Sequence, residues 1–137
     1  MKSKLKNLIL ILCLGSILLI GCNHYTGLEG TWVGRDIQKP LIDWTLTVHA
    51  NQFYLIREDL SMWYIGKFSL NNNCLLKKID LKFSDTHIQV QHGITLLGIY
   101  EIDGNSLTLM TCRPGSLLRP SSFDEYDKAV VFNFMRS

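Results

Sequence analysis

The chain has 137 residues, of which 47% are hydrophobic and 19% are charged, with 14 basic and 12 acidic residues. Three lysines fall within the first six residues, so the chain from residue 22 onward carries 11 basic and 12 acidic residues and a net charge of −1. It contains no basic run of the kind that binds a phosphate backbone, and we expect no nucleic-acid partner. The 116 residues beyond position 21 are enough for one domain with a sizeable core.

The N-terminus has the pattern of a secretory signal sequence. The three lysines precede an apolar run of 13 residues, Leu8 to Ile20. This run is shorter than the ~20 residues that a helix needs to cross a bilayer core. We therefore expect residues 1–21 to form a signal peptide, with an uncleaved membrane helix as the alternative.

The apolar run ends in Leu19-Ile20-Gly21-Cys22, which resembles the bacterial lipobox. In that motif the small residue leaves room for a peptidase, and the cysteine thiol accepts a diacylglyceryl group. The resemblance implies that Cys22 is lipidated, that residues 22–27 form a lipidated tether and that residues 28–137 form the domain. Because two or three acyl chains hold a protein stably, we expect localisation to the cell envelope, lipid-anchored to a bacterial membrane on the extracytoplasmic side. The alternative is an ordinary cleaved signal peptide with an incidental cysteine.

Beyond the tether, apolar and polar residues alternate with a period of two, which is typical of half-buried strands. Turn-forming residues such as Asn71-Asn72-Asn73 and Asp103-Gly104-Asn105 separate the alternating runs. No stretch of the mature chain has the apolar stripe of a helix. The pattern predicts eight strands, at 30–37, 43–49, 52–58, 62–70, 75–83, 86–102, 106–112 and 129–136.

Eight short strands joined by tight turns predict an antiparallel sheet that buries its apolar face by closing on itself. We therefore predict an all-β fold, a small antiparallel up-and-down barrel of about eight strands after an N-terminal signal helix. Such a barrel has an interior just wide enough to be packed or to hold one small ligand. The run 86–102 is too long for one straight strand, so we expect a bulge, a bend or a separate turn at His92-Gly93.

Gly30-Thr31-Trp32 resembles the Gly-x-Trp motif that opens lipocalin-type barrels. The resemblance implies that Gly30 lets the chain enter the barrel closely and that Trp32 plugs the closed end. It also implies that a C-terminal arginine, here Arg136, stacks on the indole through a cation–π contact.

Further motifs extend the resemblance over nearly the whole mature chain. They occur in the order seen in an uncharacterised, lipocalin-like bacterial domain family that is expanded in Planctomycetes. This family has no established activity, so the resemblance implies a fold alone. The chain departs from the family pattern at Lys77-Lys78, where a proline is usual, and in its longer stretch Ser84 to Leu97. The matching motifs are Leu28-Glu29-Gly30-Thr31-Trp32, Ile79-Asp80-Leu81, Gly98 to Leu107 and Arg119-Pro120-Ser121-Ser122-Phe123.

Catalytic and metal-binding signatures are absent from the sequence. There is no nucleophile elbow, zinc-binding helix or glycine-rich phosphate loop. The nearest two histidines are five residues apart and would point to opposite faces of a regular strand, although a bend at His92-Gly93 could bring them together. We expect no enzyme, no catalytic residue, no metal and no cofactor. The histidines are His24, His49, His87 and His92, and the carboxylate pairs interpreted as solvated charges are Glu101 with Asp103 and Asp124 with Glu125.

Two cysteines, Cys74 and Cys112, remain in the mature domain besides the lipidation site. An oxidising compartment permits a disulfide bond between them. In an eight-stranded meander they would lie at opposite barrel ends, roughly 20 Å apart, whereas a disulfide needs Cα atoms within about 7 Å. We expect that they do not pair, unless a true turn at His92-Gly93 adds a strand and brings both to one end.

The segment 113–123 is long for a barrel connection and carries two prolines, two arginines and two adjacent leucines. In a structural interpretation, which we favour, Leu117, Leu118 and Phe123 fold back and cap a barrel end. In a functional interpretation the segment contacts a ligand or a partner protein.

The arginines of this segment fit either interpretation. Arg119 pairs with a carboxylate such as Asp103 or Asp124 if the segment is structural. If it is functional, Arg113 and Arg119 frame the barrel mouth and bind an anionic ligand or a partner through forked hydrogen bonds. Tyr100 is a further candidate for ligand or partner contact.

Two classes of function remain. The first is a lipid-anchored, lipocalin-like binding module for a small apolar or amphipathic ligand. The second is an envelope protein–protein interaction or inhibitor module that acts through the 113–123 loop, with a solidly packed barrel. Large inward-facing residues favour a filled interior, and the candidate lining residues are Trp44, Phe53, Tyr64, Phe68 and Tyr100.

Overall fold

The computed structural model describes residues 27–72 and 76–137. The expected signal peptide, the lipidation site Cys22 and the cysteine at position 74 lie outside these ranges. Within them, no helix combines the length and the apolar character needed to span a membrane.

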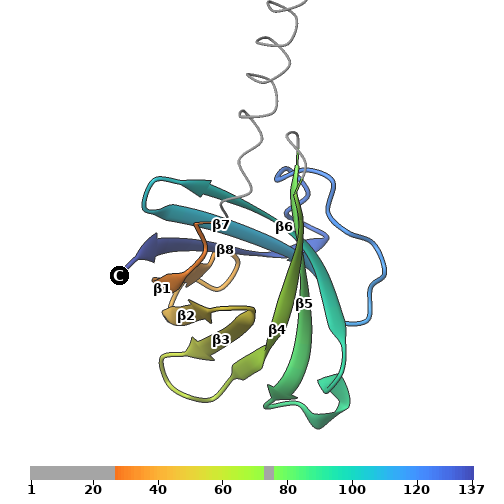
Figure 1. The fold of residues 1–137 in the computed structure, drawn as a ribbon. Coiled ribbons are helices and arrows are strands. Elements are labelled where there is room, and N and C mark those ends of the chain that lie inside the picture. Colours follow the sequence, from red (N-terminus) through yellow and green to blue (C-terminus); the bar gives the residue numbers. More distant parts are fainter. Residues whose placement is uncertain (1–26, 73–75) are drawn as a thin grey trace, which may run out of the picture.

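Eight strands form a closed barrel in which each strand pairs with its neighbours in the sequence (Figure 1). All pairs are antiparallel, and β8 closes the barrel by pairing with β1, with Trp32 opposite Arg136. The prediction of an all-β, up-and-down barrel is therefore confirmed. The strands are β1 (Gly30–Asp36), β2 (Trp44–His49), β3 (Gln52–Arg57), β4 (Trp63–Asn72), β5 (Lys77–Thr86), β6 (Thr95–Asp103), β7 (Ser106–Cys112) and β8 (Ala129–Arg136).

The predicted strand over 86–102 is wrong in its first half. β5 continues to Thr86, and a connection containing the short 3-10 turn η1 (Gln89–Gln91) precedes β6. Gly93 in this connection has a φ of +79°, a left-handed conformation that favours glycine. β5 continues through residues 84–85, which lie between two of the predicted strands. Its pairing with β4 has an irregularity between Ile65 and Gly66 that accommodates one extra residue. His92-Gly93 thus lies in a turn, but the number of strands stays at eight.

The closed end of the barrel is sealed by Trp32, which is fully buried. Its indole Nε1 donates a hydrogen bond of 2.9 Å to the Leu28 carbonyl oxygen. The Arg136 guanidinium lies 4.1 Å from the centre of the indole ring, in the cation–π arrangement that the motif implies. Gly30 has a φ of +124°, and a Cβ there would lie 3.1 Å from Nη1 of Arg136, so this position requires glycine.

The core has two parts. The larger part lies inside the barrel and is formed by the inward side chains of the strands. A smaller outer cluster, defined as Ile99, Met110, Ala129 and Val131, lies on the outside of β6, β7 and β8. Phe123 of the long β7–β8 connection packs against this cluster. These strands are therefore buried on both faces, which simple alternation does not predict.

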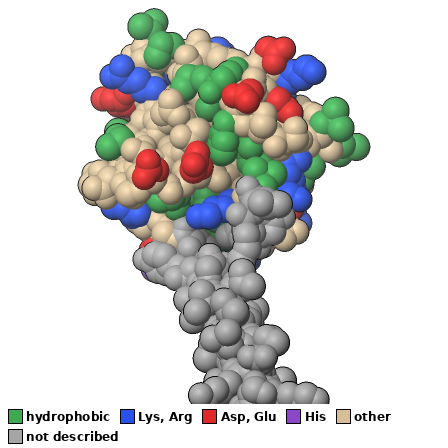
Figure 2. Space-filling view, turned by 90° about the horizontal axis from the view of Figure 1, so that it is seen from above, with side chains coloured by type: hydrophobic (Ala, Val, Ile, Leu, Met, Phe, Trp, Pro, Cys, Tyr) green, Lys and Arg blue, Asp and Glu red, His purple; other side chains and the backbone are tan. Residues whose placement is uncertain are grey.

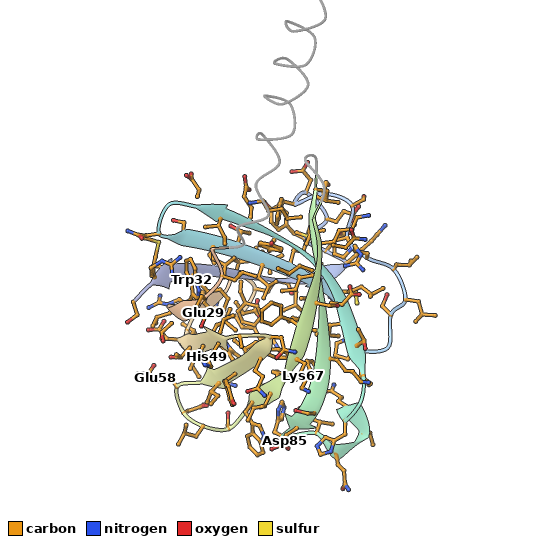
Figure 3. The ribbon with its side chains drawn as sticks, viewed as in Figure 1. Glu29, Trp32, His49, Glu58, Lys67 and Asp85 are labelled. Atoms are coloured by element: carbon orange, nitrogen blue, oxygen red, sulfur yellow. The ribbon has the colours of Figure 1, made fainter. Side chains whose placement is uncertain are left out.

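Charged side chains are dispersed over the surface. Figure 2 shows acidic and basic groups interspersed over one face of the domain, with apolar side chains between them. At the closed end, Nδ1 of His49 lies 2.8 Å from a carboxylate oxygen of Glu29 (Figure 3), and both side chains are mostly exposed.

Candidate functional site

In an up-and-down barrel alternate connections lie at the same end. The connections β1–β2, β3–β4, β5–β6 and β7–β8 surround the end opposite Trp32, which we call the mouth. Each of the four exposes at least one large apolar side chain almost completely. These side chains are Leu41, Leu60, Val90, Leu117 and Leu118.

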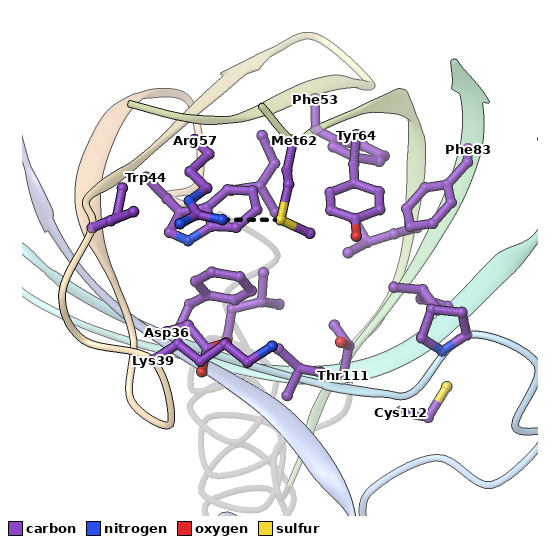
Figure 4. Close-up of a pocket in the computed structure, with 18 residues that line it drawn as sticks. Asp36, Lys39, Trp44, Phe53, Arg57, Met62, Tyr64, Phe83, Thr111 and Cys112 are labelled. Atoms are coloured by element: carbon purple, nitrogen blue, oxygen red, sulfur yellow. Dashed lines mark hydrogen bonds between the residues drawn. The ribbon is translucent and has the colours of Figure 1, made fainter. Parts of the chain in front are cut away.

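The mouth half of the barrel contains a cavity of about 220 Å³ (Figure 4). Its wall is largely apolar and includes five aromatic side chains. The Trp44 ring lies 5.5 Å from the Phe132 ring and 6.3 Å from the Tyr64 ring, and Tyr64 lies 4.9 Å from Phe83, between ring centres. The other lining residues are Asp36, Lys39, Ile42, Phe53, Leu55, Arg57, Met62, Leu81, Leu96, Leu109, Thr111, Cys112, Pro114 and Val130.

The closed half of the barrel is packed. A void of only about 20 Å³, lined entirely by apolar side chains, remains between the cavity and the Trp32 plug. A void of this size and character has little room for more than one water molecule and no polar partner for it. The barrel interior is thus filled at one end and hollow at the other.

Two hydroxyl groups belong to the cavity wall. Thr111 is 4% exposed, and Tyr64 is half-buried. No described residue forms a hydrogen bond to either hydroxyl. Burial raises the pKa of Tyr64 above its ordinary value of 10.0, so its hydroxyl stays protonated at neutral pH and can donate a hydrogen bond. Both groups can therefore bond to a polar atom inside the cavity.

Three charged residues line the entrance. Arg57 donates a hydrogen bond of 3.3 Å to the Met62 sulfur (dashed line in Figure 4), and its Nε lies 3.5 Å from a carboxylate oxygen of Asp59. Asp36 accepts a hydrogen bond of 2.9 Å from the backbone N–H of Gln38. No carboxylate among the described residues lies within 4.0 Å of the Lys39 ammonium.

Only some of the residues that we expected to line the barrel interior contact the cavity. Trp44, Phe53 and Tyr64 line the cavity, and Phe68 lines the small void at the closed half. Tyr100 is buried in the barrel core and does not line the cavity, and the Lys77 ammonium lies 5.9 Å from its ring centre. Tyr100 is therefore not placed to contact a ligand there.

Arg119 lies on the outer wall of the barrel and not at the mouth. Its Nη2 lies 2.5 Å from a carboxylate oxygen of Asp80 in β5, and its Nη1 donates hydrogen bonds to the Ile79 and Gly98 carbonyl oxygens at 3.1 and 2.8 Å. The partner is thus neither Asp103 nor Asp124, because the loop crosses β5 and β6. Arg119 thus pairs with a carboxylate, as the structural interpretation expects, but with a different one.

The expectation that Leu117 and Leu118 cap a barrel end is wrong. These side chains are 88% and 80% exposed. Phe123 does pack inward, but against the outer cluster on the barrel wall. Arg113 is exposed and donates one hydrogen bond of 3.3 Å to the Asp127 carbonyl oxygen. The tip of the loop is therefore free and its later part is anchored.

Candidate metal ligands are dispersed. Nε2 of His92 lies 3.5 Å from a carboxylate oxygen of Asp85, and Nδ1 of His87 lies 3.1 Å from the Trp63 carbonyl oxygen. Residues 27–72 and 76–137 contain no group of three or more His, Cys, Asp or Glu side chains that could hold a metal ion. Cys112 is a buried free thiol whose sulfur accepts a hydrogen bond from the Leu97 N–H at 3.3 Å.

Sequence reasoning missed Lys39, Arg57 and Thr111 as cavity residues. Lys39 lies in a connection with no periodic pattern, and Arg57 ends a strand, where an exposed charge is the ordinary interpretation. Thr111 did carry a usable signal, because a threonine two residues after the inward Leu109 must face the interior.

No family model, curated protein or solved structure matches this chain.

Proposed function

We propose that this protein is a membrane-anchored envelope lipoprotein whose lipocalin-like barrel binds a small apolar or amphipathic molecule, without enzymatic activity. The observation that supports the proposal is the cavity of about 220 Å³ with its largely apolar, aromatic wall. Concave apolar pockets with a few convergent polar groups are the usual form of small-molecule sites.

The volume limits the ligand. An apolar cavity of about 150 Å³ holds benzene, and drug-sized ligands occupy pockets of about 300 Å³ or more. The cavity lies between these values. Its occupant therefore has a buried part of about ten non-hydrogen atoms.

The anchor supports a defined orientation. The lipobox-like motif at Cys22 and the domain's first described residue, Gly27, are separated by four residues. Gly27 is held at the closed end, where its carbonyl oxygen accepts a hydrogen bond of 2.8 Å from Arg136. A lipid on Cys22 would keep the closed end at the membrane, and the mouth would then open toward the aqueous phase.

Native mass spectrometry of the protein purified from its own membrane tests the binding function. We expect a retained small molecule in addition to the acyl chains. Val130→Trp adds a large side chain to the cavity wall and should abolish retention. Val33→Trp makes the same change on the exposed outer face of β1 and should leave retention intact. Absence of any retained molecule, or equal retention by both variants, would contradict the proposal.

A second candidate is an envelope interaction or inhibitor module. The observation in its favour is the adjacent pair Leu117-Leu118, which is almost fully exposed at the tip of the β7–β8 connection. Exposed adjacent leucines are a common feature of protein-binding surfaces. A double change to serine should abolish partner binding without altering the cavity.

A further inference from the structure

The polar groups of the cavity define a chemical class of ligand. Building on the proposed binding function, we propose that the ligand is a small organic carboxylate, with an apolar body about the size of one aromatic ring. The body would occupy the aromatic part of the cavity, and the carboxylate would lie between Lys39 and the hydroxyls of Tyr64 and Thr111.

The first step of the argument concerns the apolar body. Trp44, Tyr64, Phe83 and Phe132 form a connected series of rings along the wall. Aromatic side chains pack favourably against a planar ring in offset-stacked or edge-to-face arrangements. A single ring with a short substituent has the size that the cavity accommodates. A long acyl chain would extend beyond it, because the closed half of the barrel leaves only about 20 Å³.

The second step concerns the hydroxyl groups. Thr111 and Tyr64 line the cavity, and neither hydroxyl has a hydrogen-bond partner among the described residues, so both can bond to a ligand there. The protonated Tyr64 hydroxyl and the Thr111 hydroxyl can both donate to one acceptor. A carboxylate has only acceptor sites and can receive two or more donors. It therefore satisfies both hydroxyls at once.

The third step concerns charge at the entrance. Three charged residues, Asp36, Lys39 and Arg57, line the cavity, and their formal charges sum to +1. Arg57 is paired with Asp59, and Asp36 accepts one backbone hydrogen bond and keeps its negative charge. Lys39 alone has no carboxylate within ion-pair distance in the described part of the chain. Figure 4 shows its side chain extended along the cavity edge toward the side that carries Thr111. A carboxylate ligand can form an ion pair with Lys39, which an ammonium or an alcohol cannot.

The test uses three probes with the same phenylpropyl body and different head groups. These are 3-phenylpropanoate, 3-phenylpropan-1-ol and 3-phenylpropylammonium, titrated into the full-length protein in lipid nanodiscs and followed by calorimetry. We expect the carboxylate to bind about tenfold more tightly than the other two, since a charge-assisted hydrogen bond is worth about one such factor. Equal binding of the three probes, or tightest binding of the ammonium, would overturn the proposal.

Matched variants identify the residues involved. Lys39→Gln should weaken carboxylate binding about tenfold and leave alcohol binding unchanged. Lys67→Gln removes the same charge from the exposed face of β4 and should change neither (Figure 3). Thr111→Val should weaken carboxylate binding without destabilising the fold, because its hydroxyl has no partner to lose among the residues that the structure describes. Unchanged affinity in Lys39→Gln and Thr111→Val would place the carboxylate elsewhere and overturn the proposal.

The probe titrations and native mass spectrometry together distinguish a failure of the carboxylate assignment from a failure of the proposed binding function. If none of the probes binds but native mass spectrometry finds a retained molecule of another class, the carboxylate assignment is wrong and the binding function stands. A retained phosphate-bearing molecule is one such result. If neither experiment detects a ligand, both proposals are wrong.

Discussion

At the scale of single residues, Arg136 near the C-terminus contacts the first residues of the domain. Its guanidinium stacks on Trp32 and donates hydrogen bonds of 2.8 Å to the Glu29 and Gly27 carbonyl oxygens. These carbonyl groups precede β1 and have no strand partner at that point. One side chain of the last strand thus satisfies backbone groups of the first described residues and covers the buried indole.

Removal of the plug should be costly. Trp32→Ala should lower the free energy of unfolding by roughly 3–5 kcal/mol, the range for deleting a large aromatic side chain from a core. Trp63→Ala is a suitable control, because Trp63 is only half-buried, and it should cost less than half as much. Urea denaturation of both variants measures the difference. A loss below about 1 kcal/mol for Trp32→Ala would show that the plug does not stabilise the barrel.

At the scale of elements, the β7–β8 connection acts as an outer layer over part of the barrel. Phe123 covers the outer cluster, and Arg119 binds backbone carbonyls of both β5 and β6. Gly98, whose carbonyl oxygen accepts one of these bonds, has no room for a side chain, because a Cβ there would lie 2.8 Å from the Met110 carbonyl oxygen in the neighbouring strand. The connection therefore fixes the wall of β5 to β8 from outside while its tip remains exposed.

The two arginines of this connection should differ in their effect on stability. Arg119→Ala leaves Asp80 and two backbone carbonyl groups without their donor, and should lower the free energy of unfolding by about 1–3 kcal/mol. Arg113→Ala removes one exposed hydrogen bond and should change it by no more than about 0.5 kcal/mol. Thermal and urea unfolding of the two variants provide the comparison.

A double change of Leu117 and Leu118 to serine completes this comparison. Because both side chains are exposed, stability should stay within about ±0.5 kcal/mol. Equal stability of Arg119→Ala and Arg113→Ala, or a marked loss in the double leucine variant, would contradict the arrangement described here.

The fold was largely predictable from the sequence, whereas the site was not. Period-two alternation is a local property, and it identified all eight strands. Only the boundary between β5 and β6 was predicted at the wrong residues. The Gly30-Thr31-Trp32 motif indicated the plug and its arginine. The partner of Arg119 depends on which strands the connection crosses, and no local pattern encodes that path. The cavity depends on how inward side chains of several strands fill a shared volume, so large residues at those positions gave a misleading expectation of a filled barrel.

At the scale of the whole molecule, the two ends of the barrel have different properties. The closed end contains both termini of the described domain, the Trp32 plug and dense packing, and the mouth contains the cavity and the exposed apolar loops. Five residue steps from Cys22 to Gly27 span at most about 18 Å. Strands of six to ten residues are roughly 20–34 Å long. A lipid on Cys22 would hold the closed end nearer to the bilayer than the mouth, so ligand exchange would occur with the aqueous phase or with a separate partner.

This orientation depends on lipidation of Cys22, which a single substitution tests. Cys22→Ala removes the only thiol in the lipobox-like motif, so the precursor should remain uncleaved and should not incorporate an acyl label. Cys13→Ala removes a thiol from the apolar run but leaves the motif intact, and its processing and labelling should match those of the natural chain. Metabolic labelling with an alkyne fatty acid, combined with the electrophoretic mobility of the precursor, distinguishes the two. Normal processing and labelling of Cys22→Ala would mean that another residue or segment holds the domain, and the mouth would then be free to face the membrane.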